Sequence, residues 1–357
     1  MTTASAFTPI DLRGTPLSNR IAMAPMTRSR AGAGATATEL TAAYYAQRAS
    51  AGLIITEGIQ PSAVGQGYPD TPGLHSRDQI ASWREVTDAV HAAGGKIFAQ
   101  IMHTGRIGHP VLLPEGLVNV APSAVPAKGQ VYTAEGPKDF VTPRELTGDE
   151  VRATIADFVT ASRNAIDAGF DGVELHGANG YLIHQFLAPG SNRRTDEWGG
   201  TPENRIRFAV ETAKAVSAEI GAARTGLRLS PGNPFNDISE PQDELEATYT
   251  ALVKEIGALD LAYLHIMEVG PIRDLVSTLR AGFNGPFILN PATEGPTGHD
   301  ALALVEDGTA DIVSFGALFL ANPDLPARLK AEGPYNTPDT STFYGGTDKG
   351  YTDYPAL

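Results

Sequence analysis

The chain has 357 residues, of which 42% are hydrophobic and 19% charged, a composition that supports a folded core. Its 27 basic and 41 acidic residues give a net charge of −14, which disfavours a nucleic-acid partner because such binding depends on clustered Lys and Arg. The sequence contains no cysteine, so disulfides, thiolate nucleophiles, iron–sulfur clusters and cysteine zinc sites are excluded, and redox chemistry would need a bound cofactor.

The N-terminal stretch MTTASAFTPIDLRG lacks a basic segment followed by an apolar one. No window approaches the roughly 18 uncharged apolar residues of a membrane span. We therefore expect a soluble cytoplasmic protein.

Short apolar runs rich in β-branched residues alternate with segments of helical period. In chain order, the first half predicts a strand at 21–26, a helix over 38–50, a strand at 53–58, a helix over 77–94, a strand at 96–103, a helix over 146–169 and a strand at 172–177. Thr147 and Glu150 form a capping-box pattern at the start of the third helix.

The alternation continues in the second half. A helix start at Thr201-Pro202 is followed by a strand at 226–231, a helix over 245–259, a strand at 263–269, a helix over 272–279, a strand at 286–290, a helix over 301–306 and a strand at 311–316. Eight strands, each followed by a helix, favour an α/β fold of the (β/α)₈ TIM-barrel type, with a doubly wound sheet as the alternative.

We expect one barrel domain over 1–357, with two additions. Segment 104–145, after the third strand, is rich in Pro and Gly and too long for a plain connection, so we expect a lid or small hairpin over the barrel mouth. A structural insertion elsewhere stays open as an alternative. The C-terminal stretch 333–357 is expected to form a tail near the site.

In a barrel of this type, the chemistry lies at the C-terminal ends of the strands. The residues expected there are mostly polar and include few carboxylates: Thr27, Arg28, Gly58, Gln100, His103, His176, Asn179, Tyr181, Arg228, Glu268, Asn290 and Gly316. This set disfavours the paired acids of a glycosidase or an acidic magnesium site and favours an anionic or electron-rich ligand.

His176, Asn179 and Tyr181 lie within six residues, at a strand end and the turn after it. Two donors on a carbonyl oxygen would stabilise enolate charge, and a nearby phenol would pass a proton to the adjacent carbon. From spacing alone, a purely structural role for His176 stays open. The histidines show neither HxxxH nor HxH spacing with a carboxylate partner, so we expect no metal site.

The stretch LHGANGYLIHQFLAPGSNRRTDEWGGTPENRIRF resembles the Old Yellow Enzyme family of flavin-dependent ene-reductases. The resemblance extends from NRIAMAPMTRSRA through LIITEG, AQIMHTGRIGHP and RLSPGNPFNDI to TFYGGTDKGYTDYP, so it covers almost the whole chain. It implies a (β/α)₈ barrel that holds FMN at its mouth. The flavin would be reduced by NADPH or NADH and reoxidised by an activated alkene, with hydride passing from flavin N5 to the β-carbon.

The resemblance also implies residue roles. His176 and Asn179 would bind the carbonyl or nitro oxygen of the substrate, and Tyr181 would protonate its α-carbon. The implied cofactor-binding positions are Pro25, Met26, Thr27, Gly58, Gln100, Arg228, Asn290, Gly316 and Ala317, and the implied substrate positions also include Tyr68, Met102, Phe235 and Tyr344. The only expected partner is a small alkene, without nucleic acid or membrane, and the protein is expected to be a monomer or homodimer.

Two turns depart from the family pattern. Relatives hold the FMN phosphate with a Gly-rich turn after the seventh strand and an FGR turn after the eighth, but this chain has ILNPATEGPTG and SFGALFLANPDLP. Pro291 removes a backbone donor and Ala317 stands in place of the arginine. Because an arginine–phosphate pair is a strong contact, we expect FMN to be held more weakly or by other groups.

Two alternatives follow from these turns. The opened pocket would also admit a deazaflavin coenzyme with a long tail, or the chain would be a barrel that binds phenols or steroids without a cofactor. Met102 stands where many relatives have tryptophan, which implies a wider substrate pocket.

Overall fold

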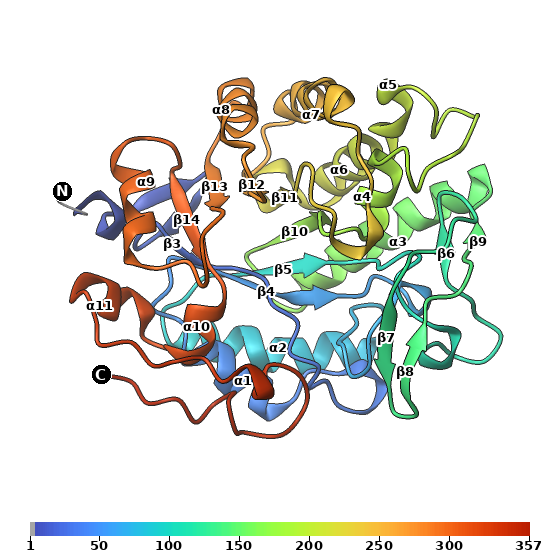
Figure 1. Ribbon diagram of the computed structural model, residues 1–357. Coiled ribbons are helices and arrows are strands. Elements are labelled where there is room, and N and C mark those ends of the chain that lie inside the picture. The colour runs from blue at the N-terminus through green and yellow to red at the C-terminus, as the bar shows by residue number, and fades with distance from the viewer. Residues whose placement is uncertain (1–3) are drawn as a thin grey trace.

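The structure, a computed structural model that describes residues 4–357, is built on a closed barrel of eight parallel strands (Figure 1). The barrel strands are β3 (Ile21–Met23), β4 (Leu53–Ile59), β5 (Ile97–Ile101), β10 (Gly172–Gly177), β11 (Thr225–Leu229), β12 (Tyr263–Met267), β13 (Phe287–Asn290) and β14 (Ile312–Phe315). Each strand pairs with the next in chain order, and β14 pairs with β3 to close the barrel. The predicted (β/α)₈ barrel is confirmed.

Helices follow the strands as predicted. They are α1 (Glu39–Ala46), α2 (Arg77–Ala92), α3 (Gly148–Asp167), α4 (Leu182–Leu187), α5 (Pro202–Arg205), α6 (Arg207–Ile220), α7 (Gln242–Gly257), α8 (Arg273–Gly282), α9 (Ala303–Glu306), α10 (Ala317–Ala321) and α11 (Leu325–Lys330). The capping box at the start of α3 is present, with Thr147 accepting from the Glu150 amide. Within residues 4–357, no helix combines the length and the apolar character that crossing a membrane requires.

The first barrel strand is shorter than predicted. The run 21–26 was expected to be extended throughout, but β3 ends at Met23. Pro25 has no N–H to donate to a ladder, and it also restricts Ala24 before it. The chain therefore leaves the sheet here, which frees Pro25, Met26 and Thr27 to line the barrel mouth.

The N-terminal end of the barrel is closed by a hairpin that the sequence did not predict. Its strands are β1 (Ile10–Leu12) and β2 (Thr15–Leu17), paired antiparallel. Leu12 and Leu17 pack into an interior cluster with residues from the lower parts of the strands, namely Ala22, Leu53, Ile55, Phe98, Tyr263, Ile288 and Ile312. Because apolar side chains fill this end of the interior, the polar chemistry is left to the C-terminal end.

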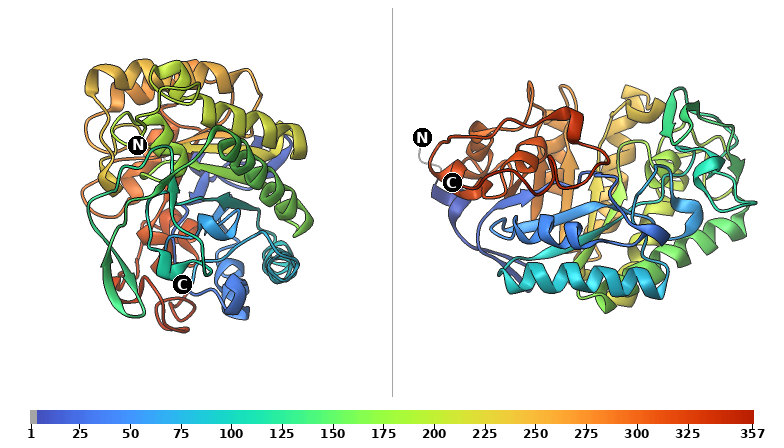
Figure 2. Two further views of the ribbon diagram at one scale, coloured as in Figure 1. Left: turned by 90° about the vertical axis from the view of Figure 1, so that its right-hand side faces the viewer. Right: turned by 90° about the horizontal axis from the view of Figure 1, so that it is seen from below.

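Segment 104–145 contains a small hairpin on the side of the molecule toward which β4 and β5 point (Figure 1; the left view of Figure 2 faces it). The hairpin consists of β7 (Gln130–Thr133) and β8 (Gly136–Asp139), while β6 (Val120–Ala121) pairs with β9 (Arg144–Glu145). Its function as a lid stays a prediction.

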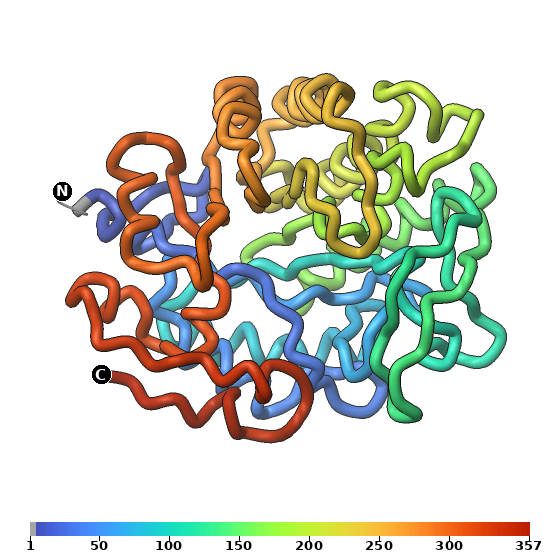
Figure 3. The backbone as a smooth tube through the Cα atoms, viewed as in Figure 1, coloured from blue at the N-terminus to red at the C-terminus, as the bar shows by residue number. Residues whose placement is uncertain are grey.

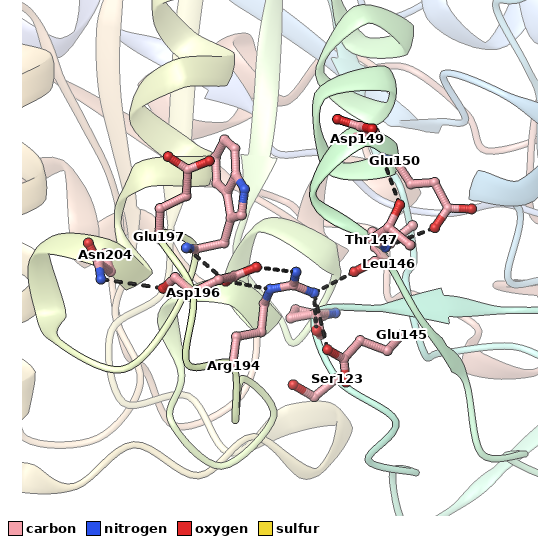
Figure 4. Close-up of polar contacts among 12 residues, drawn as sticks. Ser123, Glu145, Leu146, Thr147, Asp149, Glu150, Arg194, Asp196, Glu197 and Asn204 are labelled. Carbon is pink, nitrogen blue, oxygen red and sulfur yellow. Dashed lines mark hydrogen bonds and ion pairs between the residues drawn. The ribbon is translucent and has the colours of Figure 1, made fainter.

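Arg194 ties this insertion to the chain that follows α4 (Figure 4). The buried guanidinium donates to the carbonyl oxygens of Pro122, at 2.9 Å, and Leu146, and it pairs with Asp196. The Arg193 amide donates to Ser123 Oγ at 3.0 Å. Both ends of the hairpin region are therefore held by the loop between α4 and α5.

The C-terminal tail, residues 333–357, lies beside the segment between β3 and α1 (Figure 3). Arg28, which is fully buried, donates from Nε to the Phe343 carbonyl at 2.9 Å and from Nη2 to the Gly350 carbonyl at 2.8 Å. Tyr351 stacks on Tyr44 with ring centroids 4.2 Å apart. These contacts hold Phe343 and its neighbour Tyr344 at the barrel mouth.

We expect the Arg28→Ala substitution to lower the free energy of unfolding by about 2–3 kcal/mol, because buried carbonyl groups lose their donors. It should also accelerate tryptic cleavage after Lys349. Urea unfolding and limited proteolysis measure the two effects. The matched control is Arg77→Ala, since Arg77 is exposed at the start of α2; equal behaviour of the two variants would contradict the proposed hold on the tail.

Candidate active site

A cavity of about 300 Å³ lies at the C-terminal ends of the barrel strands, and we refer to it as the central cavity. It is lined by Pro25, Met26, Thr27, Gly58, Gln100, Met102, His176, Asn179, Tyr181, Arg228, Phe235, Gly316, Ala317, Leu320, Phe343 and Tyr344. The structure therefore brings together all predicted site residues except Asn290 and Tyr68. Leu320 and Phe343 were not anticipated, because neither lies at a strand end.

Tyr68 lies instead in an adjoining outer cavity of about 600 Å³, beneath the β7–β8 hairpin. Aromatic rings dominate its wall: Tyr68, Tyr132, Phe140, Tyr181, Phe235 and Tyr344. Tyr181, Phe235 and Tyr344 line both the outer and the central cavity, so the two spaces meet at these rings.

Asn290 lies in a third space, a side cavity of about 470 Å³ formed by the loops after β12, β13 and β14. Its Oδ1 accepts from Arg228 Nη2 at 3.0 Å, so this side chain holds the arginine, and it lines the side cavity and not the central one. Gly316 and Ala317 line both the side cavity and the central cavity. They lie at the border between the two cavities, and we refer to this border as the passage.

Backbone amides fix which way His176 and Asn179 present their donors. His176 Nδ1 accepts from the Ala178 amide at 3.2 Å, so the ring proton is on Nε2. Asn233 Oδ1 accepts from the Phe235 amide at 3.0 Å, and Asn233 Nδ2 therefore donates to Asn179 Oδ1, at 2.9 Å. The cavity is left with an N–H donor on His176 Nε2 and another on Asn179 Nδ2.

The electrostatic environment keeps His176 neutral and Tyr181 protonated. Burial, together with the charge of Arg228, holds the pKa of His176 well below its usual value. Burial and the neighbouring Tyr68 raise the pKa of Tyr181 well above its usual value. The Tyr181 and Tyr68 hydroxyls lie 3.0 Å apart, and the His176 and Tyr181 rings meet edge to face at 5.0 Å. Tyr181 is therefore a phenol that holds its proton beside two neutral donors.

Four residues expected among the strand-end groups do not line the central cavity: Asn290 and Glu268 line the side cavity, and Arg28 and His103 line neither of the two. Arg28 points into the C-terminal tail, as described above. His103 is buried with Nδ1 accepting from the Gly105 amide at 3.0 Å, and burial lowers its pKa to about 4. His103 therefore stabilises the turn after β5. The sequence gives no signal that distinguishes a histidine in this structural role from one that lines a cavity.

The glycine at position 58 has a local steric reason. A Cβ built on Gly58 would come within 2.5 Å of Met102 Sδ, so a larger residue at this position would force the Met102 side chain to move. At Gly316, by contrast, a Cβ would meet only Met26 Sδ, at 3.7 Å. The backbone beside Gly316 therefore borders open space, which is available to a ligand.

Comparison with known proteins gives the family. The model of the NADH:flavin oxidoreductase / NADH oxidase family matches residues 5–336. A Leishmania infantum protein named "probable flavin mononucleotide-dependent alkene reductase" is 41% identical over 357 residues, covering 98% of this chain and 96% of that protein.

Solved structures agree. Morphinone reductase in complex with tetrahydroNAD superposes with a TM-score of 0.93 at 43% identity, covering 99% of this chain and 98% of that one. The old yellow enzyme homologue from Zymomonas mobilis also gives a TM-score of 0.93, at 40% identity, covering 99% and 100% of the two chains.

The barrel and its mouth thus define a flavin-type oxidoreductase. The chain belongs to the NADH:flavin oxidoreductase / NADH oxidase family and, within it, is an Old Yellow Enzyme-type, FMN-dependent NAD(P)H oxidoreductase. The expected family, FMN and nicotinamide reductant are confirmed, and the family assignment favours FMN over a deazaflavin coenzyme.

The residues present fit the ring end of FMN. Arg228 is buried, and its Nε has no hydrogen-bond partner within residues 4–357, so an unsatisfied cationic donor lies at the cavity. Gln100 lies at the same wall, and Gly316 leaves open space beside the passage. These groups match an anionic, hydrogen-bonding ring edge and a side chain that leaves through the passage.

The side cavity, where the phosphate end of FMN would lie, has different chemistry. Among the described residues that line the side cavity, the charged one is Glu268, whose carboxylate binds Arg273 at 2.6 Å through both Nε and Nη2 and accepts from the Ala292 amide at 3.1 Å. Ala317 leaves no cation at the passage. The two turns that depart from the family pattern in sequence, with Pro291 and Ala317, therefore also line a cavity without a free cation among its described lining residues.

A buried carboxylate that the sequence did not single out, Glu57, lies next to Gly58. Its Oε2 accepts from the Arg28 amide at 3.4 Å, and burial raises its pKa to about 7. The unfolded chain has a pKa of about 4.3 at a glutamate. Because the folded state binds this proton more tightly, the Glu57 contribution to stability is lost as pH rises between these two values.

We expect the Glu57→Gln variant to gain stability relative to the parent by about 2–3 kcal/mol between pH 5 and pH 8, since the amide does not ionise. Urea unfolding at several pH values measures the difference. Glu85→Gln, at an exposed position on α2, is the control and should show no such trend. A difference that stays constant with pH would show that Glu57 ionises normally.

Proposed function

We propose that this protein reduces the carbon–carbon double bond of α,β-unsaturated carbonyl or nitro compounds. The observation that carries the proposal is the convergence of His176, Asn179 and Tyr181 on the central cavity that also holds the residues suited to the flavin ring. Bound FMN would supply hydride at N5, taken earlier from a nicotinamide. The protein residues bind the acceptor, polarise it and supply the proton.

His176 Nε2 and Asn179 Nδ2 would donate to one oxygen of the substrate. Two neutral donors that are already oriented stabilise the negative charge that grows on this oxygen as hydride arrives at the β-carbon, at no cost of reorganisation. A removed donor typically costs about 3–4 kcal/mol of transition-state stabilisation. The low pKa of His176 ensures that the ring does not protonate the oxygen outright.

Tyr181 would deliver the proton to the α-carbon. Its hydroxyl lies at the boundary between the central and outer cavities, and the Tyr68 hydroxyl at 3.0 Å can replenish the proton. We also propose that the β7–β8 hairpin covers the substrate, because Tyr132 of the hairpin and Phe140 just after it line the outer cavity.

An absorption spectrum with identification of the released chromophore tests the cofactor, and reoxidation tests the substrate class. The protein reduced with NADPH under exclusion of oxygen should be reoxidised by cyclohexenone or a maleimide. A flavin that is reduced but not reoxidised by either compound would contradict the alkene-reductase function. A colourless protein after incubation with both FMN and a deazaflavin would favour a binding barrel without catalysis.

The Tyr181→Phe variant should separate the two half-reactions. Alkene reduction should slow by about 10²-fold or more, the range of a general acid, while flavin reduction by NADPH stays close to that of the parent. Stopped-flow absorbance follows each half-reaction. Tyr132→Phe removes an exposed hydroxyl of the hairpin and is the control; equal losses in both half-reactions of Tyr181→Phe would contradict the assigned role.

The Ala317→Arg variant should hold FMN more tightly. A guanidinium at the passage would add a charge-assisted bond to the phosphate, which we expect to lower the dissociation constant about tenfold. Equilibrium ultrafiltration measures it, with riboflavin as the matched ligand that lacks the phosphate. An equal gain for riboflavin, or none for FMN, would show that the phosphate does not reach this position.

A further inference from the structure

A fully buried carboxylate lies inside the barrel directly beneath the central cavity. Glu174 is on β10, paired in register with Gln100 of β5, and has no solvent exposure. Its Oε1 accepts from Gln100 Nε2 at 2.8 Å, and its Oε2 accepts from His265 Nδ1 at 2.8 Å. Burying a carboxylate is costly unless such partners compensate it, so these contacts are required for Glu174 to stay ionised.

The polarity of these hydrogen bonds follows from Glu174. An ionised carboxylate only accepts, so Gln100 must turn its NH₂ group toward Glu174 and its carbonyl oxygen away from it. His265 likewise donates from Nδ1, which leaves its Nε2 to accept from Ser314 Oγ, at 2.9 Å. Burial by itself raises the pKa of the Glu174 carboxyl. The neighbouring His265 and Arg228 outweigh this effect and bring the pKa below its usual value. The carboxylate is therefore ionised and the orientation is fixed.

Arg228 completes this arrangement on the next strand. It is held by Asn290, whose Nδ2 in turn donates to the Ser314 carbonyl at 3.3 Å. Arg228 presents a cation to the central cavity, and Gln100 lies on the same wall. A flavin ring carries an imide N–H and, when reduced, a negative charge, so its pyrimidine edge fits an acceptor next to a cation.

We propose that Glu174 is a positioning residue that orients the Gln100 carbonyl toward the flavin and partly offsets the charge of Arg228, thereby restraining reduction of the bound flavin. The proposal rests on the proposed function only in requiring a flavin ring in the central cavity; it does not depend on which substrate reoxidises it. Because a negative charge opposes the addition of electrons nearby, removing that charge should favour the reduced flavin.

The test is the redox equilibrium of the holoprotein with a reference dye in the Glu174→Gln variant. The ratio of reduced to oxidised flavin at a given dye ratio should rise at least about tenfold, which corresponds to about 30 mV for a two-electron couple. A ratio equal to that of the parent would overturn the proposal.

Glu240→Gln is the matched control. Glu240 is also a buried glutamate paired with a histidine, at 3.2 Å from His184 Nε2, and it accepts from Tyr249. It contacts neither Gln100 nor Arg228 among the bonds of the described chain. The control variant should lose stability without changing the dye equilibrium; an equal shift in both variants would show a general effect of removing buried charge.

A second variant keeps the test decisive if Glu174→Gln does not fold. Glu174→Asp retains the charge but is one methylene shorter, so it cannot hold Gln100 and His265 together in the present geometry. We expect a dye equilibrium close to that of the parent and a dissociation constant for FMN at least about tenfold higher. Unchanged FMN retention would overturn the positioning role.

The outcomes separate this proposal from the proposed function, because neither readout involves an alkene. If the Glu174→Gln variant shifts the dye equilibrium as expected but the parent reduces no alkene, the role of Glu174 is supported and the alkene-reductase function is contradicted. The reverse result would retain the function and remove Glu174 from the control of the flavin.

Discussion

The ionised carboxylate of Glu174 determines the direction of the hydrogen bonds in the upper half of the barrel. A closed parallel barrel offers its interior side chains little solvent, so a charged group such as Glu174 needs protein partners of the right kind. Glu174 accepts hydrogen bonds from Gln100 of β5 and His265 of β12. Because His265 donates from Nδ1, its Nε2 must accept, and Ser314 of β14 is its donor. One acceptor thus fixes groups on strands at opposite parts of the sheet.

Next to Glu174 and its partners, the N–H donors of His176 and Asn179, which we propose to bind the substrate, are oriented through backbone amides, which cannot reverse their polarity. The turn after β10 bends sharply, with Asn179 at φ 56°, and the loop after β11 holds it: the Asn179 amide donates to Ser230 Oγ at 2.9 Å and Asn236 Nδ2 donates to its carbonyl at 2.8 Å. A strained residue persists only where its surroundings hold it in place. The two loops therefore form one rigid unit, which is what oriented donors need in order to stabilise developing charge.

The sequence was most informative where local and global signals agreed. The strand at 172–177 has the predicted bounds, because a glycine lies at each end and the residues between are buried. The β1–β2 hairpin escaped prediction because strands of three residues give no clear alternation. Around position 21, apolar character continued past Met23, but the missing amide of Pro25 ended the pairing.

For the site residues, the position along a predicted strand indicated which end of the barrel a residue lies at, but not the direction in which its side chain points. Arg28 and Asn290 are both expected at strand ends from the sequence. Arg28 instead binds the C-terminal tail, more than 300 residues away in sequence, and Asn290 holds Arg228. Glu174 was passed over because it lies within an apolar run, where its inward orientation is invisible until the barrel closes. Long-range partners of this kind cannot be inferred from spacing, since spacing specifies only the neighbours along one element.

The two ends of the cofactor site are therefore built on different physical grounds. At the end where the flavin ring would lie, the cation of Arg228 and the amide of Gln100 are buried, and in a buried site each polar contact is strong and its loss is costly. At the other end, loops bound the side cavity, and its charged residue, Glu268, is already paired with Arg273 on the more exposed side. Contacts there are weakened by solvent and by competition from that pair. The groups that we propose to bind the flavin ring, Gln100 and Arg228, lie on barrel strands, so an enzyme of this design would be able to change its phosphate turns and keep its chemistry.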